Sequence, residues 1–455
     1  MDLELGARWA HPVAVFHGRA RHPGAPEHPA GRSGRMSLEL AVARAASGAL
    51  ATIWLGIVAH QLSVPQFGQV TLVLSLGALV SIGTDLGIPL ALSKIACDHP
   101  QLDHDAVWGA VATRLVAGLV AGGVLIGLWA NAGQANRWWM AALYAVSVIM
   151  TPLGGSFLAL LRGRAIGIVE AAYDVVSKAA LLAVGLATLA AGWKPSGVIG
   201  AFVVVDVVSS LVLPIVASRR LSLVKTPDPL QRAELRLRAT LPLAAAGILG
   251  TAYERVDVWV LALLKGSASV AVYVAAYKLY DTALLPATAI AAASVAAAGH
   301  DLIANARPTA RRLGLRAAMI GAPIALVVAL ISPVLLRAAF GKHYGSASTA
   351  VVILMVASIP GAALAAITPI AMLCRRQLIV KWIVAGLVAN VVGNVVLVPL
   401  IGIRGAALAF LITDGMLLTA FYAALPSPTT PATTATPTTA APTTTAPTSA
   451  APSTA

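Results

Sequence analysis

The strongest constraint on the fold is a series of long apolar runs, because an α-helix needs about 20 mostly apolar residues to cross the hydrocarbon core of a bilayer. We count about twelve runs of this kind. They rarely alternate polar and apolar residues, as the strands of a transmembrane barrel do. We therefore predict an all-α, polytopic membrane protein with about twelve transmembrane helices in two six-helix lobes. The predicted spans lie near residues 43–62, 69–92, 108–130, 139–161, 169–192, 197–218, 241–264, 271–298, 313–338, 347–373, 379–400 and 403–424.

The composition agrees with a membrane protein. Hydrophobic residues make up 58% of the chain and charged residues only 11%, whereas roughly 25% of the residues of a soluble domain are charged. The formal net charge is +14, which raises the question of a nucleic-acid partner. The basic residues are scattered over the loops of the predicted bundle, so we expect no nucleic acid to bind.

Basic residues also orient the predicted helices, because cytoplasmic loops carry an excess of Lys and Arg. With a cytoplasmic N-terminus, the loops on that side hold Arg162, Arg164, Arg219, Arg220, Lys225, Arg232, Arg236, Arg238, Arg307, Arg311, Arg312, Arg316, Arg375, Arg376 and Lys381. The loops on the other side hold Arg137, Lys194, Lys265, Arg337, Lys342 and Arg404. We therefore predict a multi-pass protein of the cytoplasmic membrane with both termini in the cytoplasm.

The longest charged loop, "RRLSLVKTPDPLQRAELRLR", separates the first six predicted spans from the last six. Such a division is typical of transporters that bind their cargo between two similar halves. The termini are rich in Pro, with Thr and Ala added at the C-terminus, and cannot bury a core. Met36 offers an alternative natural start, which N-terminal sequencing of the native protein would test. The predicted parts are a disordered tail at 1–38, an N-lobe at 39–218, a cytoplasmic linker at 219–238, a C-lobe at 239–425 and a disordered tail at 426–455.

Charged residues inside the predicted spans are candidate functional positions, because a charge at the bilayer centre costs roughly 2.5–3.5 kcal/mol on insertion scales. Such side chains should face a cavity or a partner. The candidates are Asp85, Glu170, Asp174, Lys178, Asp206, Glu254, Arg255, Asp257, Lys278, Asp281 and Asp414. Glu170, Asp174 and Lys178 are each four residues apart and lie on one helix face. Lys278 and Asp281 are three residues apart and are also neighbours.

The seventh predicted span has the largest polar surface. Tyr253, Glu254 and Asp257 share an arc of about 100°, and Arg255 lies about 100° beyond Glu254. A helix that is polar over half its girth cannot face lipid there, so we predict that it lines a water-accessible cavity near the middle of the membrane.

Cations in this cavity would favour an anionic cargo, because the guanidinium of Arg255 can form paired hydrogen bonds with phosphate oxygens. Lys278 and Lys178 could add positive charge. The alternative, that these groups form salt bridges that only hold helices together, stays open.

Other kinds of chemistry find little support. The sequence has no G-x-x-x-x-G-K-[ST] loop for ATP and no H-x-x-x-H or cysteine pair for a metal ion. The loops between spans are short. We therefore expect a protein that is not an enzyme, with no catalytic residues, no metal site and no cofactor.

Four stretches resemble the polysaccharide-transporter branch of the multidrug/oligosaccharidyl-lipid/polysaccharide (MOP) exporter superfamily, whose members include flippases for lipid-linked oligosaccharides. They cover the chain from about residue 43 to about residue 425 in the order found in that family. They are "VPQFGQVTLVLSLGALVSIGTDLGIPLALSKIA", "ERVDVWVLALLKGSASVAVYVAAYKLYDTALLPATAIAAASVAAA", "AFGKHYGSASTAVVIL" and "ANVVGNVVLVPLIGIRGAALAFLITD".

The resemblance implies two six-helix lobes, a V-shaped central cavity and alternating access. The implied cargo is an isoprenoid-pyrophosphate-linked saccharide, which is flipped to the outer leaflet for the synthesis of cell-surface polysaccharide. The implied partners are this lipid-linked saccharide and the bilayer, with polysaccharide-assembly enzymes as further candidates.

Site residues follow from the same comparison. In this family a cationic cavity receives the diphosphate-sugar head. Arg255 and Lys278 lie in stretches that match the family, so the resemblance implies this role for them, and we add Lys178 and Tyr253 as substrate contacts. Asp257 matches the acid of the motif, and we extend it to ion coupling. Further residues that we assign to ion coupling or to the cavity wall are Glu254, Asp281, Asp85 and Asp174.

Two departures from the family keep other functions open. Some members have fourteen helices, whereas we predict about twelve for this chain. In addition, acids outnumber bases inside its predicted spans. The first alternative is a cation-coupled multidrug exporter of the same fold, with Asp85, Asp257 or Asp281 as the proton carrier. The second is a membrane glycosyltransferase or polymerase, or a scaffold that transports nothing.

Overall fold

The computed structural model describes residues 30–134, 137–164, 167–225, 227–297 and 305–426. The predicted disordered tails lie outside the described residues, except at their inner ends. Residues 30–38, which the sequence places in the N-terminal tail, form the start of the first helix.

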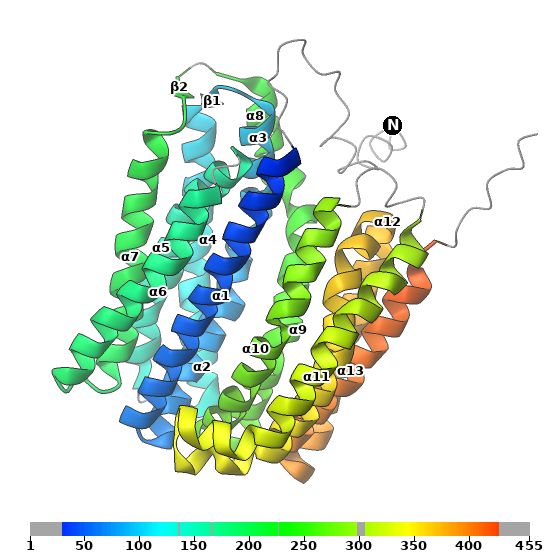
Figure 1. The fold of residues 1–455 in the computed structure, drawn as a ribbon. Coiled ribbons are helices and arrows are strands. Elements are labelled where there is room, and N and C mark those ends of the chain that lie inside the picture. The colour runs from blue at the N-terminus through cyan, green and yellow to red at the C-terminus, as the bar shows by residue number, and fades with distance from the viewer. Residues whose placement is uncertain (1–29, 135–136, 165–166, 226, 298–304, 427–455) are drawn as a thin grey trace, which may run out of the picture.

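The described chain is almost entirely helical, which confirms the all-α class (Figure 1). The N-lobe consists of α1 (Ala30–Gln61), α2 (Val64–Gly83), α3 (Ile88–Asp98), α4 (His104–Trp129), η2 (Ala130–Gln134), α5 (Trp138–Gly163), α6 (Gly167–Ala190) and α7 (Ser196–Ser218). After α8 (Pro229–Glu234), the C-lobe consists of α9 (Leu237–Lys265), α10 (Ser267–Ala297), α11 (Ala306–Phe340), η5 (Lys342–Ala347), α12 (Ser348–Ile401) and α13 (Ile403–Ala424).

Nine helical segments in the described part of the chain are long and apolar enough to cross a membrane. Two of them belong to α12, which is interrupted at Arg375, where the backbone leaves the helical region with φ −144° and ψ 46°. The other long helices, α1, α9 and α10, overlap the predicted spans near 43–62, 241–264 and 271–298. The chain is thus a multi-pass membrane protein, and the count of twelve spans stays a prediction.

The predicted second span, near 69–92, differs from the structure. Helix α2 ends at Gly83, and α3 begins only at Ile88. Between them Leu86 and Gly87 have φ angles of 49° and 71°, which no right-handed helix can contain. Apolar residues resume immediately after Thr84 and Asp85, so hydrophobicity averaged over a whole span does not reveal this turn.

The helices form two bundles, seen side by side in Figure 1. In the N-lobe α5 packs on α4 and α7, and α1 packs on α6. In the C-lobe α12 packs on α11, α13 and α10. The lobes meet mainly where α2 contacts α9 and α10, and where α1 contacts α11.

The contact between the lobes is tightest at the end of the bundle away from the β-strands. A Cβ on Gly68 of α2 would overlap the carbonyl oxygen of Ser267, at the start of α10. The buried rings of Phe67 and Tyr344 lie edge to face at 5.7 Å between centroids. Only glycine permits so close an approach of two backbones, so Gly68 lets the lobes close at this end.

The linker between the lobes is attached to the N-lobe at the opposite end. Strand β2 (Leu223–Val224) pairs in parallel with β1 (Leu102–Asp103), and these strands and α8 lie at the upper end of the N-lobe helices in Figure 1. The buried carboxylate of Asp103 accepts hydrogen bonds from Arg232 Nε (2.8 Å) and the backbone N–H of Asp228 (2.9 Å). It also caps α4, accepting from the N–H of Asp105 at 3.0 Å. The linker is therefore a docked element of the N-lobe.

These contacts lower the pKa of Asp103 to about 2, chiefly through the hydrogen bond from Arg232. A carboxyl whose pKa is depressed in the folded state stabilises that state above its unfolded pKa. This stability is lost as the pH falls through the folded pKa.

We predict that Arg232→Gln raises the pKa of Asp103 and loosens the linker. Because the unfolded pKa is near 3.8, the wild type should keep amide protection at residues 223–235 at about pH 3, where the variant should lose it. Hydrogen–deuterium exchange of the solubilised protein, corrected for intrinsic rates, measures this. Arg236→Gln, on the same linker, is the matched control. Equal protection in the wild type and both variants, at about pH 5 and also at about pH 3, would contradict the prediction.

Candidate functional site

A cavity of about 620 Å³ opens within the C-lobe, between α9, α10, α12 and α13. We call it the C-lobe cavity. Its charged and hydroxyl-bearing lining residues are Tyr253, Glu254, Tyr277, Lys278, Tyr280, Asp281, Thr368 and Asp414. Leu284, Leu364, Phe410 and Leu417 are among its apolar lining residues. Mixed linings of this kind, apolar with a few convergent polar groups, are typical of small-molecule sites.

The polar arcs of two helices, α9 and α10, both line this cavity. Glu254 of α9 is exposed, and it lines the cavity together with Lys278 and Asp281 of α10. The Lys278 ammonium lies 4.0 Å from Asp281, at the limit of an ion pair, and both side chains are partly exposed. Lys278 is therefore only loosely neutralised and can still attract an anionic group.

The innermost carboxylate, Asp414 of α13, is held by two tyrosines. The Tyr253 hydroxyl lies 2.7 Å from one of its oxygens, and the Tyr280 hydroxyl lies 3.2 Å from the other. A Cβ on Gly361 would lie 2.6 Å from the Tyr280 hydroxyl and 3.1 Å from Asp414. The absence of a side chain at Gly361 therefore leaves room for this cluster.

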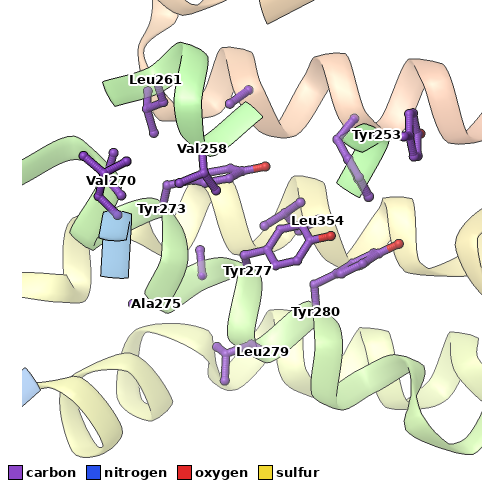
Figure 2. Close-up of a cluster of buried hydrophobic side chains, with 14 of the residues drawn as sticks. Tyr253, Val258, Leu261, Val270, Tyr273, Ala275, Tyr277, Leu279, Tyr280 and Leu354 are labelled. Atoms are coloured by element: carbon purple, nitrogen blue, oxygen red, sulfur yellow. The ribbon is translucent and has the colours of Figure 1, made fainter. Parts of the chain in front are cut away.

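Aromatic rings form one wall of the cavity. The ring of Phe410 stacks on Tyr253, with centroids 5.7 Å apart, and meets Tyr280 edge to face at 5.3 Å. Figure 2 shows Tyr273, Tyr277 and Tyr280 projecting from α10 to the same side. Flat aromatic faces beside hydroxyls and charges are suited to a cargo with both apolar and polar surfaces.

Two predicted site residues lie behind this wall. The guanidinium of Arg255 lies 5.7 Å from the ring centroid of Tyr277, a cation–π contact. Asp257 is completely buried, accepting hydrogen bonds from the Tyr273 hydroxyl at 2.5 Å and the Val258 N–H at 2.7 Å. Neither is among the described residues that line the cavity. Arg255 and Asp257 thus support the cavity wall in this conformation.

Lys178 and Asp174 lie in a different place, in the N-lobe. They line a pocket of about 80 Å³ between α6 and α7 together with Asp206 and Tyr173. Asp206 accepts a short hydrogen bond from Ser147 of α5. The stripe predicted along α6 is divided, because Glu170 is buried and forms an ion pair with Arg162 at 2.8 Å.

The remaining candidate, Asp85, lies in the turn between α2 and α3 and pairs with Arg114 of α4 at 2.5 Å. Arg114 is buried and also donates to the carbonyl oxygens of Thr84 (3.1 Å) and Pro152 (3.0 Å). It thereby ties the turn to α4 and α5. Sequence reasoning missed Arg114, although a single arginine inside the predicted span 108–130 was the signal that could have identified it.

A family described as "Polysaccharide biosynthesis protein" matches residues 35–297, more than half of the chain. The chain belongs to this family. The predicted resemblance is thus confirmed at the level of the family. No curated protein is a significant match in sequence.

Solved structures of MOP transporters share the fold. An inward-facing multidrug-resistance MATE family transporter of the MOP superfamily aligns with a TM-score of 0.58 at 16% identity, covering 85% of this chain and 93% of that one. The lipid II flippase MurJ in an inward closed conformation aligns with a TM-score of 0.61 at 12% identity, covering 85% and 86%. A MOP superfamily transporter from Pyrococcus furiosus aligns with a TM-score of 0.55 at 16% identity, covering 86% and 94%. At these identities the likeness shows the fold alone, which is that of MOP transporters.

We predict that Arg114→Met lowers the free energy of unfolding by about 2 kcal/mol, since it leaves a carboxylate and buried carbonyl groups without their donor. The value is below that of a fully buried ion pair because Asp85 is half-exposed. The midpoint of the unfolding transition of the solubilised protein measures the loss. Arg219→Met at an exposed position is the control, and an equal midpoint in both variants would contradict a structural role for Arg114.

Proposed function

We propose that this member of the polysaccharide biosynthesis family is a flippase that moves an isoprenoid-pyrophosphate-linked saccharide across the cytoplasmic membrane by alternating access. The observation that supports this most directly is the C-lobe cavity, where the ammonium of Lys278 lies among tyrosine rings and hydroxyls inside a membrane bundle. A charged group in such a place is best explained by a polar cargo.

The lining has chemistry for each part of the cargo's head. Lys278 offers a point charge to a diphosphate, and Arg255, one layer behind Tyr277, can add a second cation if the ring moves aside. The rings of Phe410, Tyr253 and Tyr280 line the cavity and suit the apolar faces of sugar rings. Thr368 and the carboxylates can bond sugar hydroxyls.

The two-lobed architecture supports alternating access. The lobes touch most closely where Gly68 meets Ser267, at one end of the bundle. Separating this contact while the opposite ends approach would open the space between the lobes to the other face of the membrane. The lipid tail would stay in the bilayer while the head crosses.

The other assigned residues receive roles within this proposal. Lys178 would contact the cargo from the N-lobe, and Tyr253 from the C-lobe. Glu254 and Asp281 would bind the driving cation in the cavity. Asp257, Asp85 and Asp174 are further ion-coupling candidates. Enzymes of polysaccharide assembly would supply the cargo on the side of both termini, which we place in the cytoplasm.

One observation favours a second function, a cation-coupled multidrug exporter. Among the described residues that line the C-lobe cavity, three are acidic, Glu254, Asp281 and Asp414, and one is basic, Lys278. An excess of acids attracts cationic compounds and can carry protons. The two functions differ in cargo, so measurements of surface glycan and of sensitivity to cationic drugs separate them.

For the flippase, we predict that Lys278→Ala and Arg255→Ala each lower the accumulation of surface glycan roughly 10- to 100-fold, the loss expected for one charge-assisted hydrogen bond to phosphate. Glycan is measured in cells that carry each variant in place of the wild type. Lys265→Ala, at the exposed end of α9, is the matched control, and equal amounts of folded protein in the membrane are required.

Normal accumulation of surface glycan in both variants would reject the proposed roles of Lys278 and Arg255 as cations that bind the cargo. Normal glycan in a deletion strain that becomes sensitive to cationic drugs would replace the flippase with the exporter. In that case Glu254→Gln and Asp281→Asn should reproduce the sensitivity.

A further inference from the structure

A second pocket of the C-lobe, of about 400 Å³, lies at the end of the lobe where α11 begins. We call it the arginine pocket. Its lining residues are Arg307, Pro308, Arg311, Arg312, Leu315 and Tyr422. None of the described residues that line it is acidic. The exposed Arg311 and Arg312 give this pocket two adjacent positive charges.

The pocket is built by two helices. The guanidinium of Arg307 lies over the ring of Tyr422, in the last turn of α13, at 5.2 Å from its centroid. This contact holds Arg307 against α13, while Arg311 and Arg312, one turn further along α11, are exposed. In the described part of the chain, no ion pair or hydrogen bond joins Arg311 or Arg312 to an acidic side chain.

The level of the pocket in the bilayer follows from the length of α11. This helix has 35 residues and is therefore about 50 Å long, whereas the hydrocarbon core is about 30 Å thick. Its uncharged apolar run, residues 317–336, begins after Arg316. The arginine pocket therefore lies at the level of the lipid headgroups, and Tyr422 has the interfacial position that aromatic residues favour.

An apolar stripe continues from the pocket into the membrane. Leu315, Met319, Leu326 and Leu330 follow Arg311 at helical spacing on one face of α11, and all four are exposed. A lipid whose headgroup lies at the arginines would thus have its acyl chains along this stripe. The arginines and the apolar stripe therefore follow one another in the same order as the headgroup and the acyl chains of a phospholipid.

We propose that the arginine pocket binds the headgroup phosphate of an anionic phospholipid of the surrounding leaflet. The site is outside the C-lobe cavity and does not depend on the identity of the transported cargo. Arg311 and Arg312 contact the phosphate, and Arg307 and Tyr422 form the floor. Such a lipid would be a structural partner of the C-lobe at the end of the bundle that carries the linker.

The test is native mass spectrometry of the full-length solubilised protein, titrated with phosphatidylglycerol or with phosphatidylcholine of the same acyl chains. The wild type should bind phosphatidylglycerol more tightly. Arg311→Gln/Arg312→Gln should weaken that binding about 25-fold, at about 5-fold for each arginine, and leave phosphatidylcholine unchanged. Arg219→Gln/Arg220→Gln, an exposed pair at the end of α7, is the matched control.

Two further measurements keep the proposal falsifiable. If the double variant does not fold, Arg312→Gln alone and Tyr422→Leu should each weaken phosphatidylglycerol binding several-fold. Inorganic phosphate and pyrophosphate at millimolar concentration should compete poorly, because they lack the acyl chains. Equal binding of both lipids to the wild type, an unchanged double variant, or full displacement by either inorganic ion would overturn the assignment.

Discussion

The structure depends on one physical constraint, the cost of an ionised side chain in hydrocarbon. With so few charged residues, nearly every charge within the bundle must be paired or face water. The protein uses both solutions. Arg114 and Asp85 form a pair braced by backbone carbonyls, and Asp257 is enclosed by donors. Glu254, Lys278 and Asp281 instead face the C-lobe cavity.

The polar groups thus fall into two sets, those that hold the fold together and those that are available to a cargo. Groups whose hydrogen bonds are satisfied by the fold hold turns and helix ends, as Asp103 does for the linker. Groups in the cavity are satisfied only in part, and Lys278 reaches Asp281 at the limit of an ion pair. A bundle that leaves polar groups available in its interior has the means to bind a cargo, and the close contact at Gly68 provides a place for the lobes to close.

Much of this could be predicted from the sequence. Apolar runs located the helices, with α13 found at its predicted bounds, and the polar arcs brought Tyr253, Glu254, Lys278 and Asp281 to one cavity. The turn at Leu86 was missed because apolar runs lie on both sides of it and were read as one span. The burial of Asp257 and the role of Gly361 were also missed. Both depend on which helices face each other, which periodicity within one helix does not determine.

The most direct test of the account is the access of water to the C-lobe cavity. With Cys97 and Cys374 replaced by serine, single cysteines would be placed at Glu254 and Asp281, at the buried Ala275 and at the lipid-facing Leu330. The account predicts that a membrane-impermeant thiol reagent modifies the first two positions and spares the other two. Protection of both Glu254→Cys and Asp281→Cys in every conformer would mean that these charges lie in a dry seam between helices, and would contradict the account.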